Sequence, residues 1–286
     1  MPAGLIARSA EYGHRVGERI LTWAAEDGYA DTVGRAYQPR TGAAQWAPEF
    51  GLEAVEPHWG IVRPFALPAA DAYQPPPPPA PFSPHPGSAF FHQATRVYQA
   101  GLTLTDEQRE IALFWSDNAR LSGTPAGHWM LIARDLVNQR GWPLDRAAQL
   151  YALLAVALAD AFTSCWHEKY RTNLLRPDTY IRAHIDPGWR PWVATPVFPE
   201  YTSGHSVASR AAATVLTDLA GATAFTDNNH APGPFAPRSF ASFHAAAEEA
   251  AISRLYGGIH YPMSIEIGLS QGEQVARHVI DTLYQR

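Results

Sequence analysis

The apolar segment at residues 147–159 constrains the fold more than any other part of this 286-residue chain. It is thirteen residues long, contains Gln149, and is followed at once by Asp160. A helix that crosses a membrane needs about 20 apolar residues, so we expect no membrane span here. The segment is apolar on nearly every side, which predicts a long helix from Pro143 to about Trp166 at the centre of the core.

The chain after residue 105 has a helical pattern throughout. Thr105 and Gln108 have the spacing of a capping box, which starts a helix. Thr124-Pro125 starts another helix, and Gly141 ends it. Runs of Val and Ile with a period of two are absent, which argues against a sheet. We therefore predict an all-α helical bundle, with further helices near residues 204–219, 239–256 and 263–284.

The first hundred residues have a different composition. Residues 10–28 predict one amphipathic helix, and residues 36–70 are rich in Pro, Gly and Trp without a steady period. The run from Pro75 to Pro79 favours a polyproline II conformation, more often a stiff connector than a ligand for an SH3-type domain. We predict two parts: residues 1–100, an irregular arm packed on the body, and residues 101–286, the helical-bundle catalytic domain.

Charge and cysteine content limit the partners. The net charge of −5 and the pI near 6.2 argue against nucleic acid or an anionic membrane, because both attract basic surfaces. The one cysteine, Cys165, cannot form an intrachain disulfide. The first twenty residues lack the apolar core of a signal peptide, which predicts a cytoplasmic location.

Ser203-Gly204-His205 lies where a Pro-rich loop meets a predicted helix. The first turn of a helix presents unpaired N–H groups and a partial positive charge, which together attract anions. Gly204 leaves room for close approach, and the Ser203 hydroxyl can donate a hydrogen bond. Taken alone, the motif is more often an ordinary N-cap followed by a surface histidine.

Two further clusters carry positive charge. Lys169 and Arg176 are seven residues apart and share a helix face if the helix continues, although Pro177 disfavours helix geometry at Arg176. Arg254 and His260 lie on either side of Gly257-Gly258. Each cluster alone is more often a solvated basic face, a helix cap or a hydrogen-bonded turn.

In combination, the three clusters resemble a known signature. Lys169-x6-Arg176-Pro177, Ser203-Gly204-His205 and Arg254-x5-His260 are similar to the three-part motif of the vanadium-dependent haloperoxidases and the type 2 phosphatidic acid phosphatases. Flanking residues also match: Phe198-Pro199-x-Tyr201, Ser253, Tyr256, Phe114-Trp115 and Gly123-Thr124-Pro125. The resemblance covers about residues 105–284.

The resemblance implies a bundle with an oxyanion at its centre, and in the haloperoxidases this anion is vanadate. His260 then coordinates the metal, and His205 is the acid–base residue. Phosphate competes for the same site. The residues expected to hold the oxygens by hydrogen bonds and charge are Lys169, Arg176, Ser203, Gly204 and Arg254.

The resemblance also assigns neighbours of the anion. Trp166 and Phe198 correspond to pocket residues, and the hydrocarbon ring at Phe198 is associated with chloride use. Asp117 corresponds to a nearby carboxylate. At residue 264 many relatives carry Asp, where this chain has Ser264, which stabilises a charged imidazole less.

We therefore predict a vanadium-dependent haloperoxidase that uses hydrogen peroxide, a halide and an organic acceptor. The resemblance also suggests a homodimer, because relatives often pair through helices. Two alternatives stay open at this point. In the phosphatase branch, His260 is a nucleophile that forms a phospho-histidine and His205 protonates the leaving alcohol. A cofactor-free relative that binds an organic substrate is the other.

Overall fold

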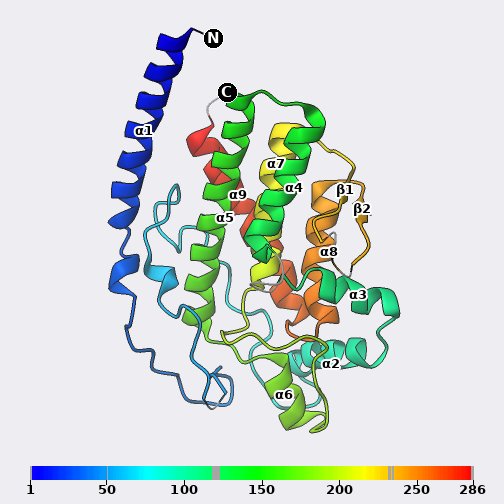
Figure 1. Cartoon of the computed structure of the whole chain (residues 1–286). Helices are drawn as coiled ribbons and strands as arrows, with labels where there is room; N and C mark the ends of the chain where they lie inside the picture. Colours follow the sequence, from blue (N-terminus) through cyan, green and yellow to red (C-terminus); the bar gives the residue numbers. More distant parts are fainter. Residues whose placement is uncertain (1, 50, 118–122, 231–232, 234, 285–286) are drawn as a thin grey trace.

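The computed structural model describes residues 2–49, 51–117, 123–230, 233 and 235–284. The described part is mainly helical, which confirms the predicted all-α bundle (Figure 1). Two 3₁₀ turns, η1 (Tyr29–Asp31) and η2 (Trp59–Ile61), lie in the N-terminal arm, and β1 (Phe225–Asp227) pairs with β2 (Arg238–Phe240) in an antiparallel sheet. The helices are α1 (Ala3–Ala25), α2 (Ala89–Leu102), α3 (Asp106–Phe114), α4 (Thr124–Arg140), α5 (Leu144–Thr172), α6 (Pro177–His184), α7 (Gly204–Ala220), α8 (Phe243–Tyr256) and α9 (Pro262–Leu283).

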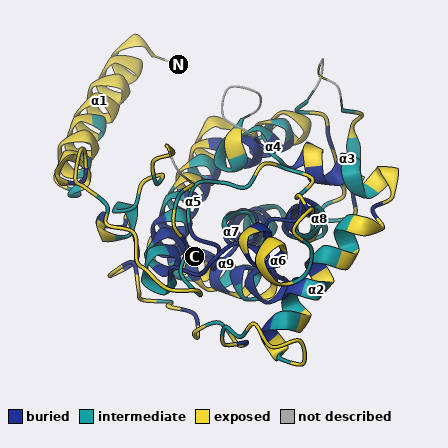
Figure 2. Cartoon of the chain, turned by 90° about the horizontal axis from the view of Figure 1, so that it is seen from below, coloured by how far each residue is buried: buried dark blue, intermediate teal, exposed yellow. Residues whose placement is uncertain are grey.

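Helix α7 lies at the centre, packed against α5, α8 and α9. Figure 2 shows α7 and α9 largely in the colour of buried residues, inside a ring of the other helices. Gly272 of α9 lies against the Val207 carbonyl, where an added Cβ would collide with that oxygen. Only glycine therefore allows α9 to approach α7 this closely, and this approach places the start of α7 inside the bundle.

The long helix α5 packs on α7, α9 and α4, as its apolar composition predicts. It extends to Thr172, beyond the predicted end near Trp166. By length and composition it would also qualify to cross a membrane, but 56% of its most apolar stretch is buried within the fold, as in a core helix.

The N-terminal arm is bound to α5 on the side of this helix that the other helices do not cover. The Asp160 carboxylate accepts three backbone N–H groups, from Phe65, Ala66 and Leu67, at 2.6–2.9 Å. Gly60 approaches the backbone of His167 so closely that an added Cβ would collide with it. Residues 55–67 therefore form part of the site's surroundings.

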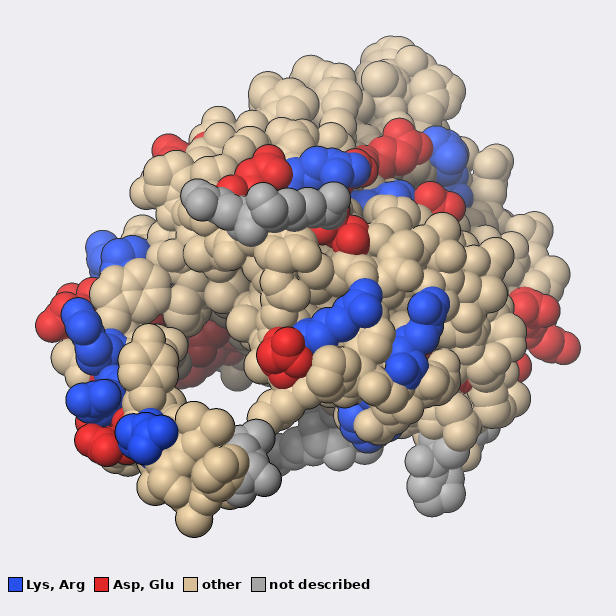
Figure 3. All heavy atoms as spheres, turned by 90° about the horizontal axis from the view of Figure 1, so that it is seen from above, with Lys and Arg blue, Asp and Glu red and all other residues tan. Residues whose placement is uncertain are grey.

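Helix α1 stands apart from the body in both ribbon views (Figures 1 and 2). None of its residues is buried, and it displays an apolar side that includes Ile6, Val16 and Ile20. It begins at Ala3, earlier than the predicted residue 10. On the face drawn in Figure 3, basic and acidic side chains are interspersed. The homodimer, the cytoplasmic location and the two-part division stay predictions.

Most predicted helix ends are confirmed. Thr105 and Gln108 form the capping box, and Gly141 ends α4 in the left-handed conformation. The helix expected from residue 239 begins only at Phe243, because residues 238–240 pair with β1 and Ser242 supplies the N-cap. The sequence analysis did not predict helices α2 and α6.

The relation between Lys169 and Arg176 differs from a shared helix face. Helix α5 ends at Thr172, where Asn173 adopts a left-handed conformation. Arg176 is the N-cap of α6, and Pro177 occupies its first turn, where a missing N–H costs nothing. The two cations are therefore brought together by a sharp change in chain direction between two helices.

Candidate active site

A cavity of about 680 Å³, here named the central cavity, opens between α4, α5, the end of α8 and the loop that leads into α7. One part of its lining is polar and includes Ser116 and Thr124, and the rest is mainly aromatic and aliphatic. It brings together seven residues that the sequence singled out: Asp117, Trp166, Phe198, Gly204, His205, Arg254 and His260. These residues come from positions as far as 143 apart, so the fold unites the separate motifs.

The Ser203-Gly204-His205 motif forms the N-terminus of α7. The Ser203 hydroxyl accepts a bond from the Ser206 N–H at 3.5 Å, so Ser203 is the N-cap, as the ordinary interpretation also predicted. An added Cβ on Gly204 would touch the Trp166 ring at 3.7 Å and the Lys169 side chain at 4.0 Å. Gly204 and His205 of this first turn both line the cavity, so the N-terminal end of α7 lies beside it.

His260 is held by a carboxylate that the sequence analysis missed. Its Nδ1 donates to Glu200 Oε1 at 2.8 Å, and the same oxygen accepts the Tyr261 N–H at 2.9 Å. This contact places the proton on Nδ1 and leaves the lone pair on Nε2. The Arg176 Nη1 donates to that Nε2 at 3.1 Å. Burial, together with Arg176 and Lys169, holds the pKa of His260 well below its usual value, so the ring is neutral.

Glu200 takes the place that the resemblance gives to an aspartate at residue 264. Glu200 is the residue written as x in the Phe198-Pro199-x-Tyr201 motif. The motif therefore pointed to this position, but the sequence analysis gave the residue no role. Burial raises the pKa of Glu200 to about 7, while Arg176 and Lys169 oppose this rise. Ser264 is buried, and its carbonyl accepts the Ser203 N–H at 3.3 Å, so it anchors the start of α7.

Lys169 is buried and points at the loop before α7. Its Nζ donates to the carbonyls of Pro199, Glu200 and Thr202 at 3.1, 2.9 and 2.5 Å. An ammonium has three protons, so all of them are engaged by this loop. Burial, helped by Arg176, lowers the pKa of Lys169 to about 8. In this structure Lys169 therefore fixes the loop and contributes positive charge, whereas we expected direct donation to the anion.

The two arginines are buried and mostly tied to backbone carbonyls. Arg176 donates to Phe198 and Ile259 at 2.9 Å each, and Arg254 donates to Ala112 at 2.7 Å. Burial lowers the pKa of each arginine to about 10, so both stay charged at neutral pH. The Arg176 Nη2 is buried and has no hydrogen-bond partner among the described residues.

His205 is half-buried and lines the cavity. Burial and the nearby Arg254 lower its pKa to about 3, so the imidazole is neutral. Its Nε2 is buried and finds no partner within the described part of the chain. Buried polar atoms are normally satisfied, and a bound oxyanion would supply a partner for the Nε2 of His205 and the Nη2 of Arg176, which both belong to the predicted anion site. A tetrahedral oxyanion fits this set of cations, imidazoles and helix N–H groups.

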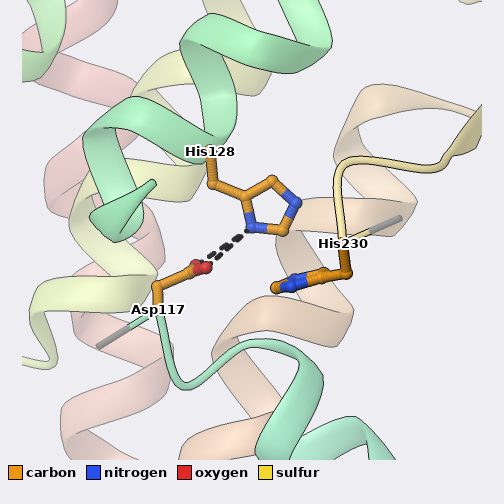
Figure 4. A group of neighbouring side chains, drawn as sticks. All are labelled: Asp117, His128 and His230. Atoms are coloured by element: carbon orange, nitrogen blue, oxygen red, sulfur yellow. Dashed lines mark hydrogen bonds and ion pairs between the residues drawn. The ribbon is translucent and has the colours of Figure 1, made fainter. Parts of the chain in front are cut away.

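Asp117 belongs to a buried network that the sequence analysis did not foresee. His128 of α4 lies between two carboxylates, with Nε2 at 2.7 Å from Asp227 and Nδ1 at 3.0 Å from Asp117. Figure 4 shows the contact with Asp117. His230 lies near, and a metal ion could be imagined among Asp117, His128 and His230. However, both carboxylates accept bonds, so both His128 nitrogens carry protons and have no lone pair for a metal. The paired carboxylates raise the pKa of His128 to about 9 against burial.

Comparisons with known proteins agree with this geometry. A family model described as the second helical-bundle domain of VCPO matches residues 149–286. Among proteins of curated function no match is found.

Two solved structures are similar to the chain over most of its length. A bacterial vanadium-dependent iodoperoxidase has 40% sequence identity and a TM-score of 0.90, covering 97% of this chain and 70% of its own. A bacterial vanadium-dependent chloroperoxidase in its holo form has 17% identity and a TM-score of 0.71, covering 91% of this chain and 69% of its own, which shows the shared fold. The first similarity extends over nearly the whole chain at an identity that fold alone does not produce, and the chain belongs to the vanadium-dependent haloperoxidases.

Proposed function

We propose that this haloperoxidase binds vanadate on His260 Nε2 and oxidises iodide with hydrogen peroxide. The observation that carries the proposal is the state of His260. Glu200 keeps the proton on Nδ1, so the lone pair stays on Nε2, where it accepts a hydrogen bond from Arg176 Nη1 that vanadate would replace. Such an oriented imidazole is the usual metal-ligating form of histidine.

Around that nitrogen, the chain's own groups suit an oxyanion. Arg176, Arg254 and Lys169 supply positive charge in a buried setting, where charge-assisted bonds are strong. The Ser203 hydroxyl and the N–H groups of the first turn of α7 add neutral donors. His128 offsets only one of the two charges of Asp117 and Asp227, and Glu200 adds a third carboxylate, so the three cations still leave a net positive charge toward the ligand. Phosphate shares the shape and charge of vanadate, and we propose that it competes.

When bound, vanadate would act as a Lewis acid toward peroxide. His205 has the matching role of a base, because its ring is neutral and its Nε2 has no partner among the described residues. The negative charge of a bound anion would raise the pKa of this ring from about 3, toward the range in which it can take a proton from peroxide. Lys169 holds the loop that carries Glu200, and thereby the position of His260. The apolar wall near Phe198 and Trp166 keeps bulk water away from the polar end.

Two considerations support iodide as the halide. The similar protein at 40% identity is a bacterial vanadium-dependent iodoperoxidase. Iodide is also the largest and most easily oxidised of the common halides, and a large ion is the least costly to move into an apolar cavity. The ring at Phe198 predicted chloride instead, so the halide preference requires a direct test.

The test is a comparison of halides with purified protein. With orthovanadate and hydrogen peroxide, we expect triiodide to form rapidly, with bromide slower and chloride slowest. Phosphate should inhibit competitively with vanadate. An absence of halide oxidation together with hydrolysis of p-nitrophenyl phosphate would instead support the phosphatase alternative.

A further inference from the structure

His128 and the two carboxylates beside it form a buried ion cluster at the edge of the central cavity. His128 is 2% exposed, Asp227 is equally buried, and Asp117 lines the cavity. Clusters of titratable groups beside a cavity are concentrated at functional sites. We propose that His128 is a positioning residue of the haloperoxidase: together with Asp227, it holds Asp117 charged and in place beside His205. This proposal rests on the haloperoxidase function proposed above.

Asp227 fixes the ring of His128 from the side away from the cavity. Its Oδ2 accepts from His128 Nε2 at 2.7 Å. Its Oδ1 accepts the backbone N–H of Asn229 at 3.0 Å and the side-chain amide of Asn229 at 2.9 Å. The other nitrogen of the ring, Nδ1, then lies 3.0 and 3.1 Å from the two oxygens of Asp117 (Figure 4). Asp117 is therefore held by a cation that is itself fixed in place.

The backbone at Asp117 needs this support. Its φ is +47°, in the left-handed region, which a residue with a side chain adopts only at a cost in free energy. Two residues earlier, the Trp115 ring stacks on the His128 ring, with the ring centres 4.8 Å apart and 28° between the planes. His128 therefore contacts residues 115–117 twice, through the ring of Trp115 and through the carboxylate of Asp117.

His205 depends on the same short segment. Burial and the charge of Arg254 lower the pKa of His205, whereas the charge of Asp117 and a hydrogen bond with the Trp115 backbone raise it. In the proposed reaction, hydrogen peroxide gives one proton to His205 Nε2. A charged Asp117 stabilises the imidazolium that forms, and a neutral Asp117 would not. His128 thus acts on this proton transfer through Asp117.

The charge of Asp117 in turn depends on His128. Burial alone would raise the pKa of Asp117, but the hydrogen bond and charge of His128 lower it below its usual value, and His205 and His230 add to this effect. Arg254 also faces Asp117, whose charge raises the pKa of that arginine. His230 cannot replace His128, because burial and His128 lower the pKa of His230 and keep its ring neutral. Without His128, Asp117 would therefore bind a proton at a higher pH.

The test compares iodide oxidation by the wild type, His128→Gln, Asp117→Asn and the double variant, each saturated with vanadate, between pH 5 and pH 8. The matched control is His278→Gln. His278 of α9 is hydrogen-bonded at both ring nitrogens, to Tyr73 and to the Ala66 carbonyl, and does not line the central cavity. Thermal unfolding at each pH checks that every variant is folded.

We expect the kcat of His128→Gln to be at least tenfold below that of the wild type at pH 5 and within threefold of it at pH 8, because Asp117 regains its charge as the pH rises. The KM for iodide should change little. Asp117→Asn and the double variant should have equal kcat, since His128 acts through Asp117. His278→Gln should match the wild type at every pH.

Two kinetic results would overturn the proposal. One is a ratio of His128→Gln to wild-type kcat that is the same at pH 5 and at pH 8. The other is a further loss of more than threefold when His128→Gln is added to Asp117→Asn.

A second measurement needs neither halide oxidation nor a folded variant. Nitrogen chemical shifts of the His128 ring in the wild type should show protons on both nitrogens at pH 7. A neutral His128 in a wild type that oxidises iodide would refute the role of His128 alone. A wild type that forms no triiodide with vanadate and peroxide would refute the proposed function, and the role of His128 with it.

Discussion

Glu200 should control the affinity for vanadate through the ring of His260. Glu200→Ala removes the acceptor of both the His260 Nδ1–H and the Tyr261 N–H, which are 2.8 and 2.9 Å from the same carboxylate oxygen. Loss of the partner of a ligating histidine commonly lowers metal affinity 10–100-fold. This range corresponds to about 1.4–2.7 kcal/mol of binding free energy. Because both donors are left buried, we expect the upper part of the range, a loss of about 100-fold.

The conservative variant separates position from charge. Glu200→Gln retains an oxygen that can accept from His260 Nδ1 but removes the negative charge. We expect a loss of about tenfold or less, because a charge-assisted bond is roughly twice as strong as a neutral one. The control is Glu168→Gln, which changes another buried carboxylate whose partner is Arg171, away from the cavity lining. Its vanadate affinity should equal that of the wild type.

The assay is titration of each folded variant with orthovanadate, followed by calorimetry or ⁵¹V magnetic resonance. Nitrogen chemical shifts of the His260 ring should show the proton on Nδ1 in the wild type and a mixture of tautomers in Glu200→Ala. An affinity of folded Glu200→Ala within twofold of the wild type would refute the reasoning. Glu200 would then have no role in positioning His260, even if the variant turned over more slowly.

Three further predictions concern other parts of the molecule. The folded pKa of His128, about 9, exceeds the ordinary 6.5, so its stabilisation is complete below about pH 6.5 and is lost as the pH rises through 9. This pKa shift corresponds to about 3 kcal/mol of unfolding free energy. Between pH 6 and pH 9.5, the free energy of unfolding measured with urea should therefore fall by that amount more in the wild type than in His128→Gln. An equal fall in the two proteins would contradict the prediction. Asp160→Ala should release the arm, so that limited proteolysis cuts within residues 36–70 faster while the bundle stays intact; unchanged cleavage would argue against this anchor. His260→Ala should abolish vanadate binding, whereas His205→Ala should bind vanadate and mainly lose turnover, and equal wild-type activity in both would end the site assignment.

The sequence alone was sufficient where the physics is local. The capping box at Thr105 and the left-handed glycine at Gly141 depend on a few neighbouring residues, and both helix ends are where the pattern predicted them. The apolar segment at 147–159 predicted a buried helix, because a helix that is apolar on nearly every side is stable only away from water. The three short motifs also carried enough chemistry to predict an oxyanion site.

Only the tertiary structure decided which groups meet. Glu200 serves His260 from 60 positions away, and no local pattern could select it over Ser264, because the choice depends on how two loops pack. The same holds for Lys169, whose three protons are engaged by carbonyls of a loop 30 or more residues away, and for Trp59 of the arm, which forms a cavity wall. A buried hydrogen bond forms between a donor and an acceptor that are removed from water at the same place in the fold. Which groups these are depends on the packing of the whole bundle, not on the local sequence.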